Sequence, residues 1–309
     1  MINTDIAQWV DPDLRAALAV LPDLGSLSVD TLPGIRQLLA GIVPLDPPSG
    51  LTVENVSLAV PGEAPNVTGL LHRPATPGPH PALLNLHGGG FVAGTAERED
   101  AAMRALCLSL DAVILSIDYR LAPETPFPGA LDDAFAALNW LHDHADRLAI
   151  DRTRIAVRGV SAGGGLAAGL ALYARDRSGP DLAFLSLVYP MLDDRTGPQP
   201  CAGQYVWPIA ANRFAWSSYL AGIDPVPSYA APARADSLAG LPPTFIATGS
   251  IDLFADENIR FAQRLMQSGV PTELHIYPGA YHGFTLIAAS GVAQRFERDS
   301  LNALRLALA

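Results

Sequence analysis

Short apolar segments alternate with helix-like segments along most of the chain after residue 80. Strands are predicted at 82–86, 112–119, 154–160, 182–189, 244–249 and 272–277, and the segment 112–119 is rich in β-branched residues. Helices are predicted at 97–109, 129–147, 162–174, 254–268 and 290–308, with a further one around 211–220. Apolar strands that alternate with helices predict an α/β fold, in which a mostly parallel sheet is covered by helices on both faces.

Two parts of the chain depart from this rhythm. Residues 51–60 alternate apolar and polar side chains, and 67–72 follow a Pro-Gly turn, so these segments are expected to be paired strands. Residues 1–50 have helical patches broken by prolines, and 191–240 is too long for a simple connection. We therefore predict a single domain whose cap is formed by about 1–48 and about 191–240.

Composition narrows the classes of protein and of partner. A chain of 309 residues fits one hydrophobic core, and its net charge of −11, with no basic cluster, makes nucleic acid an unexpected partner. No apolar stretch is long enough for stable membrane insertion, and no basic segment precedes a signal-like stretch. Cys107 and Cys201 have no metal-type spacing and are expected to be free thiols. These features favour a cytoplasmic protein without a bound metal.

Gly159-Val160-Ser161-Ala162-Gly163 is the one GxSxG motif of the chain. It follows a predicted strand and opens a predicted helix, which is the context of a nucleophile elbow. Glycines on both sides allow the strand and the helix to approach each other, and the start of the helix adds positive potential. The pattern predicts that Ser161 is a nucleophile, against the simpler interpretation of a glycine-rich turn.

A serine nucleophile needs a base, and the base needs an orienting acid. His282 lies in a loop directly after the last predicted strand, at the sheet edge where open α/β sheets bind ligands. Asp252 follows the preceding strand at the same edge, whereas Asp256 begins a helix, where a carboxylate commonly stabilises the helix dipole. We favour Asp252 over Asp256, which gives the chain order Ser161, Asp252, His282.

The segment His87-Gly88-Gly89-Gly90-Phe91 follows an early strand. Acyl transfer passes through an oxyanion that needs preorganised N–H donors, and glycines let the backbone turn its amides inward. We predict that the amides of Gly88, Gly89 and Ala162 form this oxyanion hole. The alternative is a merely flexible glycine loop.

Five motifs occur together in the chain: HGGGF at 87–91, YRLAPE at 119–124, GVSAGG at 159–164, DLFADE at 252–257 and YHGF at 281–284. They resemble the hormone-sensitive-lipase family (bacterial family IV) of carboxylesterases in the α/β-hydrolase superfamily. The resemblance implies an eight-stranded α/β-hydrolase sheet with a helical cap. It also implies cofactor-free hydrolysis of short- to medium-chain acyl esters, and a homodimer paired through the last strand. We interpret the YRLAPE segment as structural.

One position departs from the family's pattern. Many members have an acidic residue or a threonine before the serine, where this chain has Val160. The change removes a polar group beside the elbow. The family's substrate and pH preferences therefore do not transfer directly to this chain.

The residues that contact the substrate are less well defined by the sequence. Trp207, Phe214 and Trp216 of the 191–240 segment are candidates for the acyl pocket, with packing inside the cap as the alternative. The same catalytic residues would also hydrolyse amides, lactones or carbamates. A receptor that binds without turnover would be expected to lack one of the three catalytic residues, and a purely structural domain would need neither HGGG nor the elbow.

Overall fold

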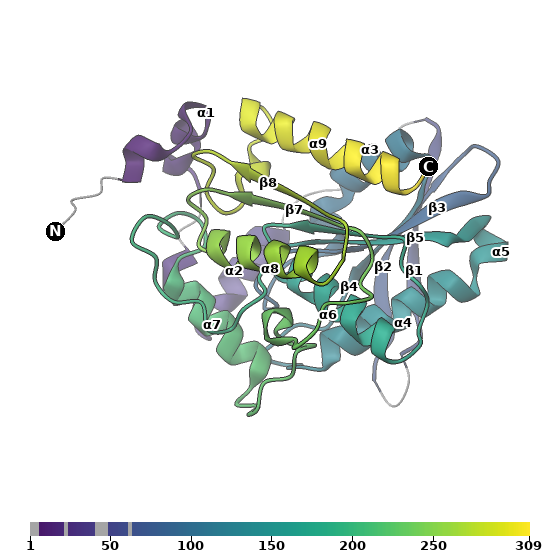
Figure 1. Ribbon diagram of the computed structural model, residues 1–309, viewed down its shortest axis with the longest axis horizontal. Coiled ribbons are helices and arrows are strands. Elements are labelled where there is room, and N and C mark those ends of the chain that lie inside the picture. Colours follow the sequence, from purple (N-terminus) through teal and green to yellow (C-terminus); the bar gives the residue numbers. More distant parts are fainter. Residues whose placement is uncertain (1–5, 22–23, 41–48, 61–63) are drawn as a thin grey trace.

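An eight-stranded sheet forms the centre of the molecule (Figure 1). The structure is a computed structural model that describes residues 6–21, 24–40, 49–60 and 64–309. The sheet order is β1-β2-β4-β3-β5-β6-β7-β8. The pairs β1–β2 and β2–β4 are antiparallel, and the other neighbouring pairs are parallel. The strands are β1 (Leu51–Leu58), β2 (Val67–Pro74), β3 (His80–Leu86), β4 (Val113–Asp118), β5 (Ile150–Val160), β6 (Phe184–Val188), β7 (Thr244–Gly249) and β8 (Thr272–Tyr277). The predicted fold class is confirmed.

Helices cover both faces of the sheet. In Figure 1, α3 (Asp100–Leu110) and α9 (Gly291–Ala307) lie on one face, and α4 (Gly129–Asp143), α6 (Ala162–Asp176) and α8 (Ala255–Gln267) lie on the other. Each layer has its own hydrophobic core. Strands β3, β6 and β7 are buried along their whole length, as expected for strands that helices cover on both faces.

The predicted helix over 129–147 is two helices. The chain leaves α4 at His144, and α5 (Ala145–Leu148) ends at Ala149, which has a left-handed backbone with φ of 52°. Strand β5 then begins at Ile150, four residues before its expected start at Arg154. A left-handed residue ends a helix and redirects the chain at once.

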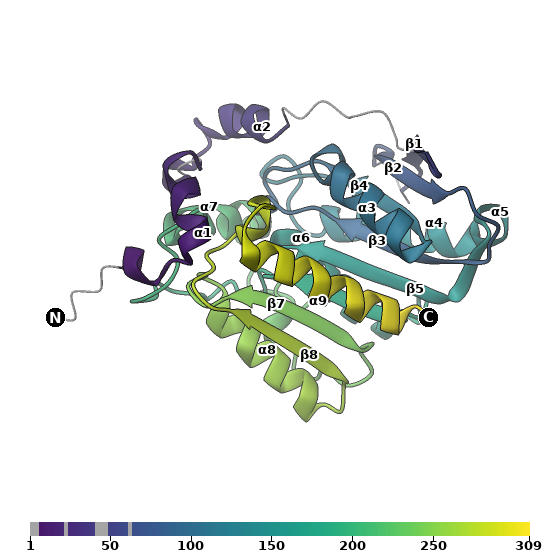
Figure 2. The ribbon, with the colours of Figure 1, turned by 90° about the horizontal axis from the view of Figure 1, so that it is seen from above.

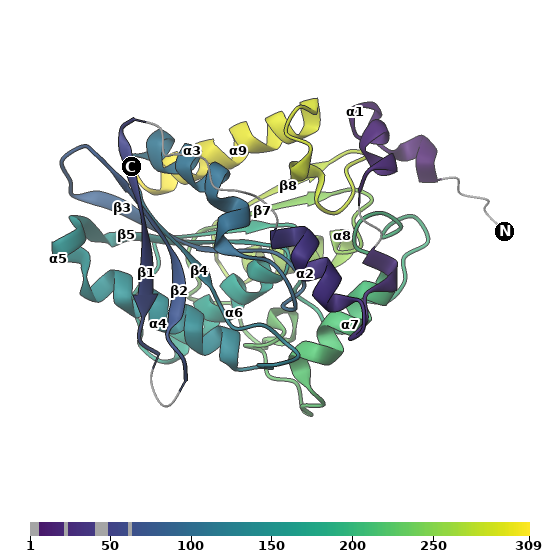
Figure 3. The ribbon, with the colours of Figure 1, turned by 180° about the vertical axis from the view of Figure 1, so that it is seen from behind.

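The N-terminal segment and the 191–240 segment meet at one end of the molecule. Figures 2 and 3 show α1 (Pro12–Arg15), α2 (Leu32–Ala40) and α7 (Ile209–Leu220) gathered at the end away from the C-terminus. Short 3₁₀ turns complete these segments and the loops: η1 (Ile6–Trp9), η2 (Ala16–Ala19), η3 (Leu24–Ser26), η4 (Ala96–Glu99), η5 (Pro232–Arg234) and η6 (Phe284–Leu286). Turn η3 contacts α7. Within the expected cap segment 1–48, residues 1–5, 22–23 and 41–48 lie outside the described residues.

Polar contacts fasten the N-terminal segment to the main body. Arg36 of α2 donates to Val92 O at 2.7 Å and to both carboxylate oxygens of Glu124 at 2.7 and 2.8 Å. The carbonyl of Leu14 accepts from the Tyr281 hydroxyl at 3.3 Å, beside His282 in the chain. None of the helices in the described ranges has the length and apolarity required to cross a bilayer.

Candidate active site

Ser161 occupies a sharp turn between β5 and α6. Its backbone has φ of 55° and ψ of −118°, a conformation that L-residues rarely adopt. The turn is held by Ser161 N–H donating to Val188 O and by Ser161 O accepting from Met191 N–H, both at 2.9 Å. A Cβ on Gly159 would collide with the backbone of Gly163. The glycines of the motif therefore make the close strand-helix approach possible.

The three predicted catalytic side chains form one hydrogen-bonded chain. Ser161 Oγ lies 2.9 Å from His282 Nε2, and His282 Nδ1 lies 2.9 Å from Asp252 Oδ2. Asp252 is fully buried, and its other oxygen accepts from the N–H of Phe254 at 2.9 Å. Because a carboxylate only accepts, Nδ1 carries the imidazole proton, and Nε2 is left to accept the serine proton.

The topology of the sheet explains why these residues meet. Asp252 and His282 follow β7 and β8, which are parallel neighbours, so both loops leave the sheet at the same edge. Asp256, the other candidate acid, lies in the first turn of α8 with an exposed side chain, 4.0 Å from Arg260. The structure brings Asp252 to the imidazole and leaves Asp256 at the surface.

Aromatic side chains surround the imidazole of His282. The ring centroids of Tyr189, Phe254 and Trp207 lie 4.7, 5.1 and 6.2 Å from that of His282. Burial raises the pKa of Tyr189 above its usual range, so its hydroxyl, 2.6 Å from Thr285 Oγ1, stays protonated. This surrounding limits water around His282, which strengthens its hydrogen bonds to the serine and the carboxylate.

The glycine loop after β3 presents amides beside the serine. Gly89 and Gly90 have φ of 127° and 64°, which turns their peptides in directions that other residues rarely reach. In the described part of the chain, the N–H groups of Gly89, Gly90 and Ala162 have no hydrogen-bond acceptor. The N–H of Gly88, a predicted oxyanion donor, instead donates to Glu99 Oε1 at 3.3 Å. Gly88 is therefore already engaged, and Gly90 offers a donor that the sequence did not single out.

Tyr119 supports the first residue of the glycine loop, His87. The His87 ring stacks on Tyr119 at 4.2 Å, and the Tyr119 hydroxyl donates to His87 O at 2.7 Å. Burial lowers the pKa of His87, so its imidazole is neutral at physiological pH and adds no charge beside the oxyanion donors. The first residue of the YRLAPE segment thus supports the loop, as its structural interpretation requires.

A cavity of about 480 Å³ opens over Ser161 and His282. Apolar residues from the N-terminal segment and from α3 and α9 line much of it: Leu24, Leu27, Ile35, Leu39, Ala102, Ala105, Leu106, Phe296 and Leu301. Trp207 also lines the cavity, but Phe214 and Trp216 do not. The Trp216 ring packs on Phe91 and Tyr219, at centroid distances of 5.6 and 6.1 Å. Trp216 is thus buried in the hydrophobic core, and Phe214 packs against that core from α7.

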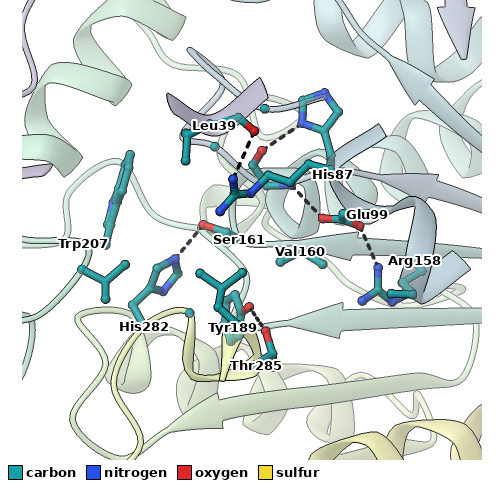
Figure 4. Close-up of a pocket in the computed structure, with 18 of the residues that line it drawn as sticks. Leu39, His87, Glu99, Arg158, Val160, Ser161, Tyr189, Trp207, His282 and Thr285 are labelled. Atoms are coloured by element: carbon teal, nitrogen blue, oxygen red, sulfur yellow. Dashed lines mark hydrogen bonds and ion pairs between the residues drawn. The ribbon is translucent and has the colours of Figure 1, made fainter. Parts of the chain in front are cut away.

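Two charged residues near the loop were not singled out from the sequence. Glu99 and Arg158 both line the cavity and form an ion pair at 3.1 Å (Figure 4). In the sequence, this ion pair could have been suspected from Arg158, a charged residue within the strand that leads directly to the elbow. A charge at such a position requires a buried partner.

The described residues contain no group of His, Cys, Asp and Glu side chains able to hold a metal ion.

Comparison with known proteins shows the fold family of this chain. A family model described as alpha/beta hydrolase fold matches residues 83–286. Esterase LipI of Mycobacterium tuberculosis is 36% identical, over 97% of this chain and 95% of that protein. The chain belongs to the α/β-hydrolase-fold esterases. This esterase is also 38% identical to carboxylesterase NlhH of the same organism, over 67% of each chain.

Solved structures extend the match to nearly the whole molecule. The structure of a bacterial heroin esterase superposes with a TM-score of 0.89 and 39% identity, over 98% of this esterase and 99% of that chain. Esterase LipW from Mycobacterium marinum gives a TM-score of 0.85 and 34% identity, over 98% and 97% of the two chains.

Proposed function

We propose that this esterase is a serine carboxylesterase that hydrolyses short- to medium-chain acyl esters through an acyl-enzyme intermediate. The observation that carries the proposal is the hydrogen-bonded chain from Ser161 Oγ through His282 to Asp252, which opens into a cavity. We also propose membership in the hormone-sensitive-lipase family, which the five sequence motifs support. LipN of Mycobacterium tuberculosis, named as a carboxylic ester hydrolase, is 33% identical over 96% of this chain.

The first half of the reaction acylates the serine. His282 Nε2 takes the proton of Ser161 as Oγ attacks the ester carbonyl, and Asp252 stabilises the imidazolium that forms. The carbonyl oxygen becomes an oxyanion bound by the amides of Gly89 and Ala162, with Gly90 as a further donor. The Gly88 amide joins them only if it leaves Glu99. The C–O bond to the alcohol then breaks, and the alcohol leaves with the proton from His282.

The second half releases the acid. Water gives a proton to His282 Nε2 and attacks the acyl carbon of the acyl-Ser161 ester. The oxyanion forms again on the same amides and collapses, and Ser161 recovers its proton from His282. Both halves need only side chains and amides of this chain, so no cofactor is required.

The cavity supports the proposed range of substrates. About 480 Å³ lies within the size range of small-molecule sites and is lined largely by apolar side chains. We propose that the predicted cap acts through its described parts, 6–21, 24–40 and 191–240, because Leu27, Ile35 and Trp207 come from these segments and line the cavity. Trp207 is the one predicted pocket aromatic that we retain as a substrate contact.

Initial rates on p-nitrophenyl esters from acetate to palmitate test the proposal. Wild-type protein is expected to turn over short and medium chains fastest, and Ser161→Ala is expected to lose activity by roughly 10⁴-fold or more. Folded wild-type protein that hydrolyses none of these esters would contradict the proposal. A peak of activity at palmitate would contradict the chain-length assignment alone.

A further inference from the structure

A partly buried ion pair contacts the glycine loop. Glu99, at the end of η4, and Arg158, in β5, are 3.1 Å apart, and their side chains are 15% and 10% exposed. Asn85 of β3 bonds to both partners, with Nδ2 donating to Glu99 Oε2 at 3.0 Å and Oδ1 accepting from Arg158 Nη1 at 2.6 Å. Three elements therefore fix the carboxylate of Glu99 in one orientation.

The other oxygen of Glu99 reaches the loop itself. Glu99 Oε1 accepts from the N–H of Gly88 at 3.3 Å, and Figure 4 shows Glu99 between the loop and Arg158. The bonded peptide lies against the nucleophile, since a Cβ on Gly88 would be 3.5 Å from Ser161 Cβ. Any shift of the Gly88 peptide would rotate the next two amides, those of Gly89 and Gly90, relative to the serine.

Charge balance explains why Glu99, which accepts from the Gly88 N–H, is paired with Arg158. A lone carboxylate beside the oxyanion donors would repel the negative charge that develops in the transition state, and water screens this repulsion poorly inside a protein. The guanidinium of Arg158 balances the negative charge of the Glu99 carboxylate. Val160, the residue before the serine, brings no charge of its own to this place. The pair thus supplies an acceptor for the loop at little electrostatic cost to catalysis.

We propose that Glu99, neutralised by Arg158, is a positioning residue for the oxyanion hole of this esterase. It holds the Gly88 peptide so that the following amides face the acyl carbonyl. The inference rests on the proposed function, because it assigns Glu99 to the same reaction. It requires that loss of the carboxylate lowers kcat and leaves KM nearly unchanged, because the transition state depends on the donors more than the bound ester does.

The test compares Glu99→Ala and Glu99→Gln with wild type on p-nitrophenyl butyrate. Glu99→Ala is expected to lower kcat by on the order of 10-fold to 100-fold, less than the loss of a whole oxyanion donor. Affinity for phenylboronic acid, which forms a tetrahedral adduct on serine, is expected to fall by a similar factor. Glu99→Gln keeps an acceptor for Gly88 and is expected to retain more of kcat than the alanine variant.

Asp194→Asn is the matched control. Asp194 forms a similarly partly buried pair with Arg234, at 2.6 and 2.9 Å, and does not line the cavity. It is expected to lower the melting temperature without changing kcat.

Two outcomes would overturn the proposal. A rise in KM with unchanged kcat in the Glu99 variants would make the pair a substrate contact, and Glu99 variants with the same kcat and KM as active wild type would show no role for the pair. Wild type that neither hydrolyses the ester nor binds the boronate would overturn the proposed function first. Should Glu99→Ala not fold, Glu99→Gln and the boronate measurement decide.

Discussion

The nucleophile side and the loop side of the cavity are built on different principles. On the nucleophile side, His282 forms hydrogen bonds of 2.9 Å to Ser161 and to Asp252, so the proposed catalytic groups hold one another in place. On the loop side, the proposed oxyanion donors are backbone amides, and side chains outside the reaction, such as Tyr119 and Glu99, hydrogen-bond to the loop that carries them. The proposed reaction therefore depends on particular side chains on the nucleophile side and on the backbone conformation on the loop side.

This difference predicts two patterns of damage. A change on the nucleophile side removes a proton acceptor or its correct tautomer, so it abolishes turnover of every ester to the same degree. A change on the loop side shifts donors or walls by fractions of an ångström, so its effect is graded and can depend on the substrate. Variants ordered by the size of their effect separate the two patterns.

The largest effect in this comparison is expected for Asp252→Asn. An amide at this position can donate to His282 Nδ1 and so favours the tautomer in which Nε2 carries the proton and cannot accept from Ser161. We expect kcat to fall by roughly 10⁴-fold on acetate and octanoate esters alike. Steady-state rates at pH 8 measure the loss.

Asp256→Asn is the matched control for that variant. It changes the same chemical group four residues along, where the side chain is exposed. We expect activity within about twofold of wild type, since exposed substitutions away from a site have small effects. Equal losses in the two variants would contradict the assignment of Asp252.

A smaller, substrate-dependent effect is expected for Trp207→Phe. Trp207 lines the cavity and fills the space over Gly90, where its Cη2 would collide with an added Cβ. A smaller ring enlarges the cavity, so the ratio of kcat/KM for octanoate over acetate is expected to rise by about tenfold. Trp216→Phe, in α7 within the hydrophobic core, is expected to lower the melting temperature and leave this ratio unchanged. A shifted ratio in Trp216→Phe instead would move the substrate contact to α7.

The next effect concerns stability and pH. Glu257 follows Asp252 on the same segment, and burial raises the pKa of its carboxyl group to about 8, against an ordinary value of 4.5. The folded state therefore holds this proton more tightly than the unfolded chain, so the stabilisation is complete below about pH 4.5 and is lost as the pH rises through about 8.

Glu257→Gln removes this titration while its amide oxygen can still accept from Leu192 N–H, which Glu257 binds at 2.6 Å. Urea unfolding at pH 5, 6.5 and 8 is expected to show that the free energy of unfolding of wild type, relative to the variant, falls with pH. Parallel pH curves for the two proteins would mean that Glu257 does not hold a proton in the folded state.

The smallest effect on activity is expected from thiol modification. Cys107 is fully buried, and burial raises the pKa of its thiol to about 12, whereas Cys201 is half-buried. Because the thiolate is the reactive form, a disulfide reagent is expected to modify Cys201 first and Cys107 only after unfolding. Ester hydrolysis is expected to survive the first modification. Prompt reaction of two thiols in folded protein would contradict the burial of Cys107.

The sequence predicts the nucleophile side better than the loop side for a physical reason. Ser161, Asp252 and His282 follow the ends of β5, β7 and β8, and the carboxyl ends of parallel strands lie at one edge, so strand positions alone bring these residues near one another. Which amide of a glycine loop is free depends on contacts such as Glu99 with Gly88, between residues that share no local pattern. The same limit applies to Trp216, whose direction depends on how α7 packs.

One local expectation in the N-terminal segment was also wrong. Prolines were expected to break the N-terminal helices, yet Pro33 lies in the first turn of α2, where a missing N–H costs nothing. Pairing of two copies through the last strand stays a prediction; β8 is an edge strand of the sheet, and Ile276 on it is exposed.

Covalent labelling of the serine tests the central claim most directly. Wild type and Ser161→Ala would be incubated with diethyl p-nitrophenyl phosphate and analysed by intact-mass measurement and peptide mapping. We predict one diethyl phosphoryl group per wild-type chain, located on Ser161, loss of ester hydrolysis in proportion to labelling, and no label in the variant. Label on another residue, or an unlabelled wild type that still hydrolyses esters, would contradict the assignment of Ser161 as the nucleophile.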